Sequence, residues 1–235
     1  EELKMPLEQV RVPGGDTSKT PYDRSTGASR STTLAGMAVL RAASEVRTQL
    51  MEIATNVFGL PEMALEMRDG AIWHETESVT FPDLIKAHFG MVGGELMGRG
   101  EVRPVKGSGS YAEGPVFWEV CVGGVELEVD PDTGRVTVRK VVSVADVGKA
   151  INPRLVEAQE MGGSMQGLGN ALYEEMIFDD MGQLHNSTLF DYHIPTMADM
   201  PGEFDSNIVE NADGPGPYGA KGVGESATVG APPAI

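Results

Sequence analysis

The amino-acid sequence predicts an α+β fold in which mixed sheets and hairpins pack against helices. Apolar residues recur at helical spacing over residues 31–58, and a glycine follows that supplies a helix stop. Residues 116–129 and 135–147 are rich in alternating β-branched residues, and a turn-forming Asp-Pro-Asp-Thr-Gly segment joins them into an antiparallel hairpin. Helices and strands follow one another in irregular order, which favours α+β over a regular βαβ repeat.

The first half of the chain is predicted to hold two helices and a hairpin. It opens with the end of a helix, a turn at Pro6 and a strand over residues 10–12. A loop of small and hydroxyl residues then leads into the long helix. The Asp-Gly pair at 69–70 predicts a hairpin turn, and either Thr80 or Asp83 is the expected N-cap of a second helix.

The second half begins with a glycine-rich stretch, 90–114, that we expect to form a long connection before the hairpin. Asn152, followed by proline, predicts the start of a helix that runs to Leu172, and the glycines inside this helix indicate close packing. A second hairpin is expected to turn at 180–182. Residues 211–235 have almost no periodicity.

Composition excludes several classes of function. The 35 acidic and 18 basic residues give a net charge of -17, which opposes binding to nucleic acid or an anionic membrane. No stretch approaches the roughly 18 apolar residues of a membrane span, and the start lacks a signal-peptide pattern, so we expect a cytoplasmic protein. The single cysteine, Cys121, excludes an intrachain disulfide or a Cys-x-x-Cys metal site. The four histidines have no zinc-site spacing.

Two glycine-rich segments near the C-terminus fit dinucleotide-binding patterns. Residues 214–219 fit G-x-G-x-x-G, and residues 222–227 fit the variant that ends in alanine. Both signals are weak, because such a site needs a strand before the glycines and two prolines interrupt the first match. Glycine-rich backbone can nevertheless approach a ligand closely. The charged residues there, Lys221 and Glu225, are as compatible with a surface ion pair as with a catalytic pair.

The segment 219–225 reads Gly-Ala-Lys-Gly-Val-Gly-Glu, and 230–235 follows as Gly-Ala-Pro-Pro-Ala-Ile. These residues resemble the C-terminal signature of the molybdopterin-binding (large) subunits of molybdenum hydroxylases, the family of xanthine dehydrogenase and aldehyde oxidase. Further blocks resemble that family in the same order, at 15–21, 26–31 and 147–169. The resemblance implies the C-terminal half of such a subunit, with a first α+β part at 1–105 and a second at 106–235 that contains the glutamate motif.

The resemblance implies an oxidoreductase that hydroxylates an aldehyde, an N-heterocycle or a related electrophilic carbon, with water as the oxygen source. In this family the glutamate of the motif faces the metal, so Glu225 would be the general base that takes the proton of the molybdenum-bound hydroxyl. A subunit that keeps the fold but only assembles or scaffolds such a complex is the alternative.

The resemblance also implies a cofactor site in which the pterin dithiolene holds the molybdenum and no protein side chain ligates it. The loop at 27–31 would wrap the pterin and its phosphate, Gln159 would contact the cofactor near the metal, and Lys221 would be a positioning residue. The cofactor-binding residues expected on this basis are Gly27, Ala28, Ser29, Arg30, Ser31, Gln159, Lys221, Gly222 and Gly224. Two simpler interpretations stay open, an N-cap box for the long helix and a solvent-facing Gln159.

The cofactor implied is a molybdopterin-type molybdenum cofactor, with the cytosine dinucleotide form as one option. Iron-sulfur clusters and FAD are expected on partner chains, because one cysteine cannot ligate a cluster. The N-terminal motifs of the family are not found in the sequence. We therefore expect an N-terminal half or a partner molybdopterin-binding subunit, besides an iron-sulfur subunit, a flavin subunit and a small-molecule substrate, and we expect the chain alone not to hold the cofactor tightly.

Overall fold

The computed structural model describes residues 1–23, 26–90, 93–103 and 117–235. The chain divides into two compact units, the first made of Glu1–Ser25 and Leu34–Arg103 and the second of Thr26–Thr33 and Pro104–Ile235. The second unit therefore includes a short segment from early in the sequence. Helices and small sheets occur in both units, and the predicted α+β class is confirmed.

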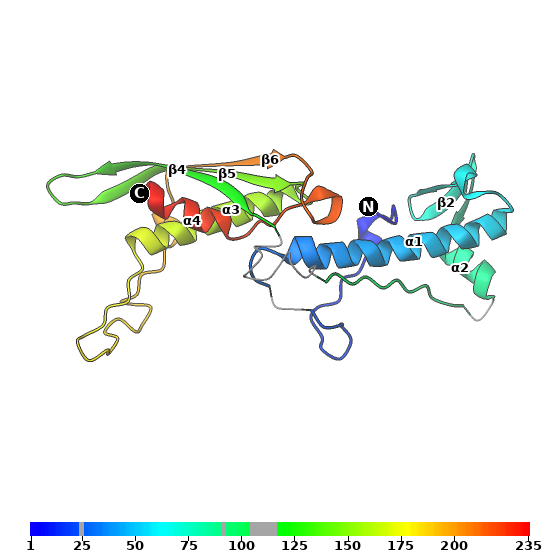
Figure 1. Cartoon of the computed structure of the whole chain (residues 1–235), viewed down its shortest axis with the longest axis horizontal. Coiled ribbons are helices and arrows are strands. Elements are labelled where there is room, and N and C mark those ends of the chain that lie inside the picture. Colours follow the sequence, from blue (N-terminus) through cyan, green and yellow to red (C-terminus); the bar gives the residue numbers. More distant parts are fainter. Residues whose placement is uncertain (24–25, 91–92, 104–116) are drawn as a thin grey trace. The chain divides into compact units, whose positions relative to one another are not determined.

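The first unit contains a long helix, a short helix and a small antiparallel sheet (Figure 1). A π-helical turn, Ser31–Ala35, leads into α1, Gly36–Phe58, and a left-handed Gly59 ends this helix. The sheet has the order β1 (Glu66–Arg68), β2 (Ala71–His74) and β3 (Glu77–Thr80), and helix α2 (Phe81–Phe89) follows. The core of this unit includes Leu50, Ile53, Ala54, Ile72 and Leu84.

The hairpin turn and the second helix of the first unit form where the sequence predicts them, whereas the first residues of the chain fold differently. The hairpin turn at 69–70 is confirmed, and Thr80 is the N-cap of α2, since its side chain accepts a hydrogen bond from Asp83 N. The predicted helix end at the start of the chain is only a turn. The strand at 10–12 is wrong, because these exposed residues follow the 3-10 turn Leu7–Gln9 and pair with no strand of the described residues. Strand β3 was not predicted.

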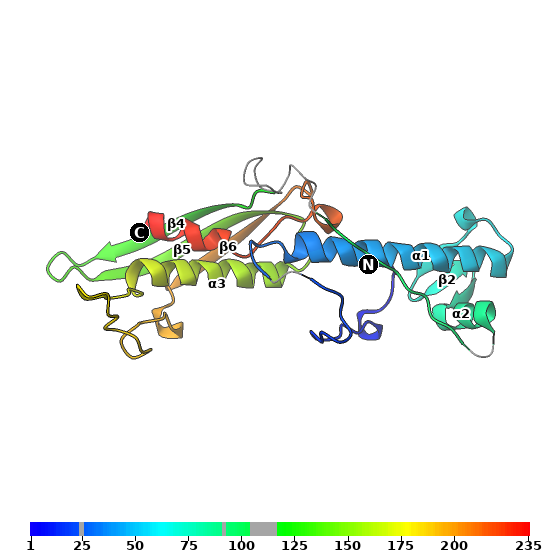
Figure 2. The ribbon, with the colours of Figure 1, turned by 60° about the horizontal axis from the view of Figure 1, so that its bottom comes forward.

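The second unit is a three-stranded sheet with helices on one face (Figure 2). Strands β4 (Val120–Val129) and β5 (Val136–Gly148) form the predicted antiparallel hairpin. Strand β6 (Glu203–Glu210) pairs with β5 in parallel, and it was not predicted. Helix α3 (Pro153–Leu172) begins at the predicted Asn152, whose side chain accepts a hydrogen bond from Leu155 N at 3.2 Å.

The hairpin predicted at 180–182 is present in minimal form, as a turn flanked by one antiparallel bridge between Phe178 and Leu184. Within it the backbone N–H of Gly182 donates to the carbonyl of Asp179. The C-terminal tail folds into helical turns, Pro217–Gly219 and Pro232–Ala234, and a short helix α4, Ser226–Gly230. Of the predicted connection 90–114, residues 91–92 and 104–114 lie outside the described residues.

Glycines on α3 bring α4 against it, as their pattern predicted. A Cβ atom added to Gly163 would lie 3.1 Å from the Cβ of Ala227, and one added to Gly167 would lie 2.6 Å from the carbonyl oxygen of Thr228. The second distance is too short for any side chain, so alanine at Gly167 would separate the two helices. This packing fixes the position of Glu225, the residue directly before α4.

No helix among the described residues is long and apolar enough to cross a lipid bilayer.

Candidate active site

Glu225 lies at the end of the glycine-rich segment, and its side chain is exposed. Its carboxylate oxygen Oε2 accepts a hydrogen bond of 3.1 Å from the hydroxyl of Ser29, which lies 196 residues earlier in the chain. The segment 26–33 and the C-terminal tail belong to the same unit. The structure therefore brings together the expected base and the expected cofactor loop.

The loop that contains Ser29 has an unusual backbone. Ala28 and Ser29 both have positive φ angles, 54° and 51°, in the left-handed region. Two consecutive L-residues in this region cost about 1–2 kcal/mol each, so the rest of the unit must stabilise the turn. Helix α1 follows directly on the π-helical turn Ser31–Ala35, and its cap residue Ala35 makes no side-chain cap hydrogen bond. The hydroxyl of Ser29 is bound to Glu225 instead.

The glycines of the motif leave space for backbone contact with this loop. A Cβ added to Gly222 would lie 2.6 Å from the carbonyl oxygen of Ser29 and 2.6 Å from a ring carbon of Phe117. A Cβ added to Gly224 would lie 3.1 Å from Ser29 Oγ and 3.7 Å from Oε1 of Gln159. Gln159 is exposed on α3 and adjoins the motif. Five of the expected site residues thus converge: Ser29, Gln159, Gly222, Gly224 and Glu225.

Glu119, a residue that the sequence did not single out, also contacts the motif. Its Oε1 accepts hydrogen bonds from the backbone N–H of Gly224 at 2.8 Å and of Glu225 at 3.4 Å. Glu119 directly precedes β4 and is half-buried. One sequence signal could have identified Glu119, because an acidic residue beside a stretch of β-branched residues is unfavourable unless its carboxylate has a partner.

Lys221 does not pair with Glu225, so the surface ion pair between them is wrong. Its ammonium group lies 2.7 Å from Oδ2 of Asp146 and 2.7 Å from Oδ1 of Asp213. The backbone N–H of Lys221 donates to the carbonyl of Val147, which places its side chain beside the preceding residue of β5. Lys221 therefore joins the motif to the end of β5 and to the segment after β6.

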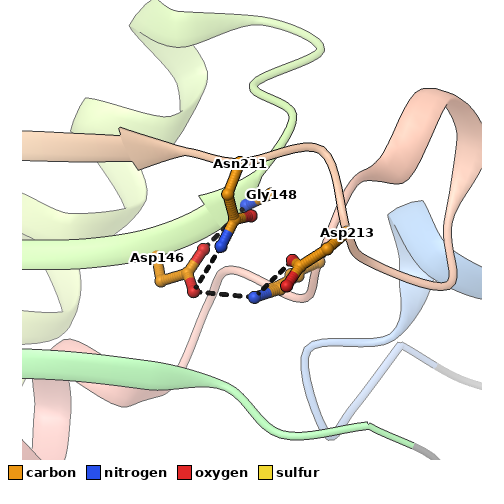
Figure 3. Close-up of polar contacts among 5 residues, drawn as sticks. Asp146, Gly148, Asn211 and Asp213 are labelled. Carbon is orange, nitrogen blue, oxygen red and sulfur yellow. Dashed lines mark hydrogen bonds and ion pairs between the residues drawn. The ribbon is translucent and has the colours of Figure 1, made fainter.

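Asp146 is the centre of this polar cluster (Figure 3). It also accepts hydrogen bonds from the side chain of Asn211 at 3.2 Å and from the backbone N–H of Gly148 at 3.1 Å. The bond from Lys221 is the main reason that the pKa of Asp146 lies below its ordinary value of 3.8. The same bond raises the pKa of Lys221 above 10.5. Both groups are therefore charged at neutral pH.

A second polar cluster lies under the sheet, between β4, β5 and α3. The carboxylate of Glu160 is only 1% exposed and accepts a hydrogen bond from the hydroxyl of Ser143. The thiol of Cys121 lies 3.5 Å from the same carboxylate oxygen, and burial raises the pKa of this thiol. The cysteine is therefore a protonated packing group. In the described part of the chain, no three His, Cys, Asp or Glu side chains are grouped to hold a metal ion.

Comparison with known proteins identifies the family. Residues 1–201 match the family model described as a molybdopterin cofactor-binding domain. The chain belongs to this family. The predicted resemblance to molybdenum hydroxylase large subunits is thus confirmed, and Glu225 lies beyond the residues that the family model matches.

Individual relatives of this molybdopterin cofactor-binding domain agree with the family. The nicotine 6-hydroxylase large subunit of Paenarthrobacter nicotinovorans is 32% identical over 246 residues, which cover 99% of this chain and 29% of that protein. The carbon monoxide dehydrogenase large chain of Hydrogenophaga pseudoflava is 31% identical over 238 residues, which cover 99% of this chain and 28% of that protein. The chain therefore spans less than a third of the length of these curated relatives.

A solved structure shows the same fold. The crystal structure of a Cu,Mo-CO dehydrogenase in its carbon monoxide reduced state matches with a TM-score of 0.85 at 26% identity. The match covers 99% of this chain and 29% of that chain. The cofactor-binding domain described here thus has the fold of part of a molybdenum hydroxylase large subunit.

Asp146→Asn in this domain is expected to lower the free energy of unfolding at neutral pH, with an effect that disappears in acid. A carboxyl with a depressed pKa stabilises the fold above its ordinary value of 3.8, and this contribution is lost as pH falls through the lower folded-state pKa. Urea unfolding of both proteins between about pH 3 and pH 7 measures the difference. A difference that does not change with pH would contradict the ion pair with Lys221.

Proposed function

We propose that this chain forms part of a molybdenum-cofactor-dependent oxidoreductase that hydroxylates an electrophilic carbon with oxygen from water, and that Glu225 is its general base. The hydrogen bond between Ser29 and Glu225 supports this proposal most directly, because it joins the expected base to the expected cofactor loop. Relatives named as a nicotine 6-hydroxylase and a carbon monoxide dehydrogenase support the reaction class. An aldehyde or an N-heterocycle is the substrate class that we propose.

The groups around Glu225 fit an organic cofactor. Hydroxyl and amide groups of Ser29 and Gln159 surround a motif whose glycines lack side chains, so polar atoms and backbone are available for hydrogen bonds to a pterin. We assign cofactor binding to the loop 27–31, to Gln159 and to the two glycines, Gly222 and Gly224. Lys221 is held by two aspartates and therefore positions the motif.

The bound cofactor supplies a redox-active metal that takes up the two electrons of the oxidation. The residues of this chain then have two tasks, which are to position the reacting groups and to remove a proton from the oxygen nucleophile. Ser29 donates its hydroxyl hydrogen to Oε2 of Glu225, which orients the carboxylate, and we assign proton transfer to the other oxygen, Oε1. A carboxylate held in this way within reach of the water-derived oxygen nucleophile meets the geometric requirement for general-base catalysis.

We further propose that the cofactor is a molybdopterin-type molybdenum cofactor, with the cytosine dinucleotide form as one option, and that iron-sulfur clusters and FAD lie on partner subunits. Relatives named as a large subunit, a large chain and the gamma subunit of a dehydrogenase complex support an assembly of several chains. The single cysteine of this chain cannot ligate an iron-sulfur cluster. An N-terminal half or a partner molybdopterin-binding subunit would complete the cofactor site, and we propose a cytoplasmic location.

Isotope labelling tests the reaction class. The enzyme that contains this chain is expected to convert a member of a panel of aldehydes and N-heterocycles, and the product formed in ¹⁸O-labelled water is expected to contain the label. Mass spectrometry of the product measures this incorporation. Label that enters the product from ¹⁸O₂ and not from water would contradict the proposal. An enzyme that oxidises no member of the panel, and that also does not oxidise carbon monoxide, would contradict it as well.

A further inference from the structure

We propose that Glu119 is a positioning residue that fixes the backbone of Gly224 and Glu225. This inference rests on the proposed role of Glu225 as the general base. The Glu119 carboxylate accepts hydrogen bonds from the N–H groups of both Gly224 and Glu225. It does not contact the Glu225 side chain through any of these bonds. Its effect on catalysis would therefore pass through the main chain.

The motif needs such an anchor because it has little side-chain bulk of its own. Glycines such as Gly222 and Gly224 lose more conformational freedom on folding than other residues do, and they offer no side chain for packing. Hydrogen bonds must then define the backbone. One side-chain oxygen that accepts two backbone N–H groups fixes two consecutive residues, and the 2.8 Å contact from Gly224 N has the length of a good hydrogen bond.

Glu119 is well placed to transmit the rigidity of the sheet. The next residue, Val120, begins β4 and pairs with Asp146 of β5 in the antiparallel register. Asp146 in turn binds Lys221. The motif is therefore attached twice to the same end of the hairpin, through Lys221 to β5 and through Gly224 to the residue before β4. Ser29 then orients the carboxylate itself. Main chain and side chain of Glu225 thus have separate anchors.

Two substitutions of Glu119 distinguish a positioning role from a role in proton transfer. Only Oε1 of Glu119 accepts the two amide hydrogen bonds, and the amide oxygen of a glutamine can accept them equally. Glu119→Gln should therefore keep the backbone in place, whereas Glu119→Ala should release it. If Glu119 transferred protons, both variants would be impaired to the same degree.

The test compares Glu119→Ala, Glu119→Gln and the control Glu126→Ala in the whole enzyme. Glu126 is an exposed residue of β4, the strand that Glu119 directly precedes, so its replacement removes the same charge close by in the sequence. Hydrogen-deuterium exchange of the peptide 219–230 is expected to become faster in Glu119→Ala and to stay unchanged in the other two variants. This readout requires neither substrate nor turnover.

Turnover is measured on the same samples, with the substrate that the panel of aldehydes and N-heterocycles identifies. Glu119→Ala should lower kcat about 10- to 100-fold with little change in KM or molybdenum content, because a small misplacement of a catalytic group has an effect of this size. Glu119→Gln should retain most of the activity. Unchanged exchange and kcat in Glu119→Ala, or equal losses in both Glu119 variants, would overturn the inference. If Glu225→Gln is fully active but hydrogen-deuterium exchange of the peptide 219–230 becomes faster in Glu119→Ala, the proposed role of Glu225 is wrong. The role of Glu119 in fixing the backbone is then still supported.

Discussion

Glu225→Gln is expected to lower turnover by about 10²- to 10⁴-fold, the contribution that general-base catalysis usually makes. Glutamine has almost the same shape as glutamate, and its amide oxygen can still accept the hydrogen bond from Ser29. The amide cannot take up a proton, so the variant removes the chemistry and keeps the structure. Steady-state kinetics and molybdenum content, measured on the purified enzyme, should show lost kcat with unchanged metal.

The matched control is Glu126→Gln, which makes the same substitution at an exposed position of β4. It should behave as the wild-type enzyme does. Full activity of Glu225→Gln would favour the alternative in which this chain only assembles or scaffolds the complex. Loss of molybdenum together with activity would show a role in holding the cofactor and would contradict a purely catalytic role for Glu225.

Gly222→Ala is expected to have the second largest effect. The added Cβ would meet the backbone oxygen of Ser29 and the ring of Phe117, both at 2.6 Å, and the backbone contact cannot be relieved by a side-chain rotation. We expect turnover to fall about 100-fold, because the cofactor loop must move away from the base. Overpacking of this kind also lowers the free energy of unfolding by about 1–3 kcal/mol. Kinetics and urea unfolding measure the two effects.

Gly224→Ala, two residues along the same motif, is the control for this prediction. Its Cβ would lie 3.1 Å from the hydroxyl of Ser29, the end of a short side chain that can adjust. We expect this variant to lose less activity and less stability than Gly222→Ala. Equal effects of the two substitutions would mean that contact with the Ser29 backbone does not determine the geometry of the site.

Elements with a strong local signal were predicted well. The periodicity of α1, the two strands of the hairpin and the N-cap of α3 at Asn152 are all properties of neighbouring residues, and the structure contains each of them. Strand β6 was missed because its pairing with β5 is parallel and its polar residues weaken the apolar pattern. The strand predicted at 10–12 failed for the opposite reason, since its residues have the right character but pair with no strand in the described part of the chain.

The site itself shows what a sequence can and cannot indicate. The expected importance of Ser29, Gln159 and Glu225 came from a family resemblance, since no spacing rule relates residues so far apart. The spacing of four residues between Lys221 and Glu225 suggests an ion pair, but this spacing brings side chains together only on a helix, and residues 220–223 are not helical. Glu119 binds backbone amides, which every residue type except proline has, so no residue pattern identifies such a partner.

The close contact between α3 and α4 has a mechanical consequence for the site. Gln159 lies on α3, and Glu225 directly precedes α4, which touches α3 through the backbone at Gly163 and Gly167. A larger side chain at either glycine would push α4 away from α3. It would therefore change the distance from Gln159 to Glu225 although it replaces neither residue, so the shape of this helix contact sets part of the geometry of the site.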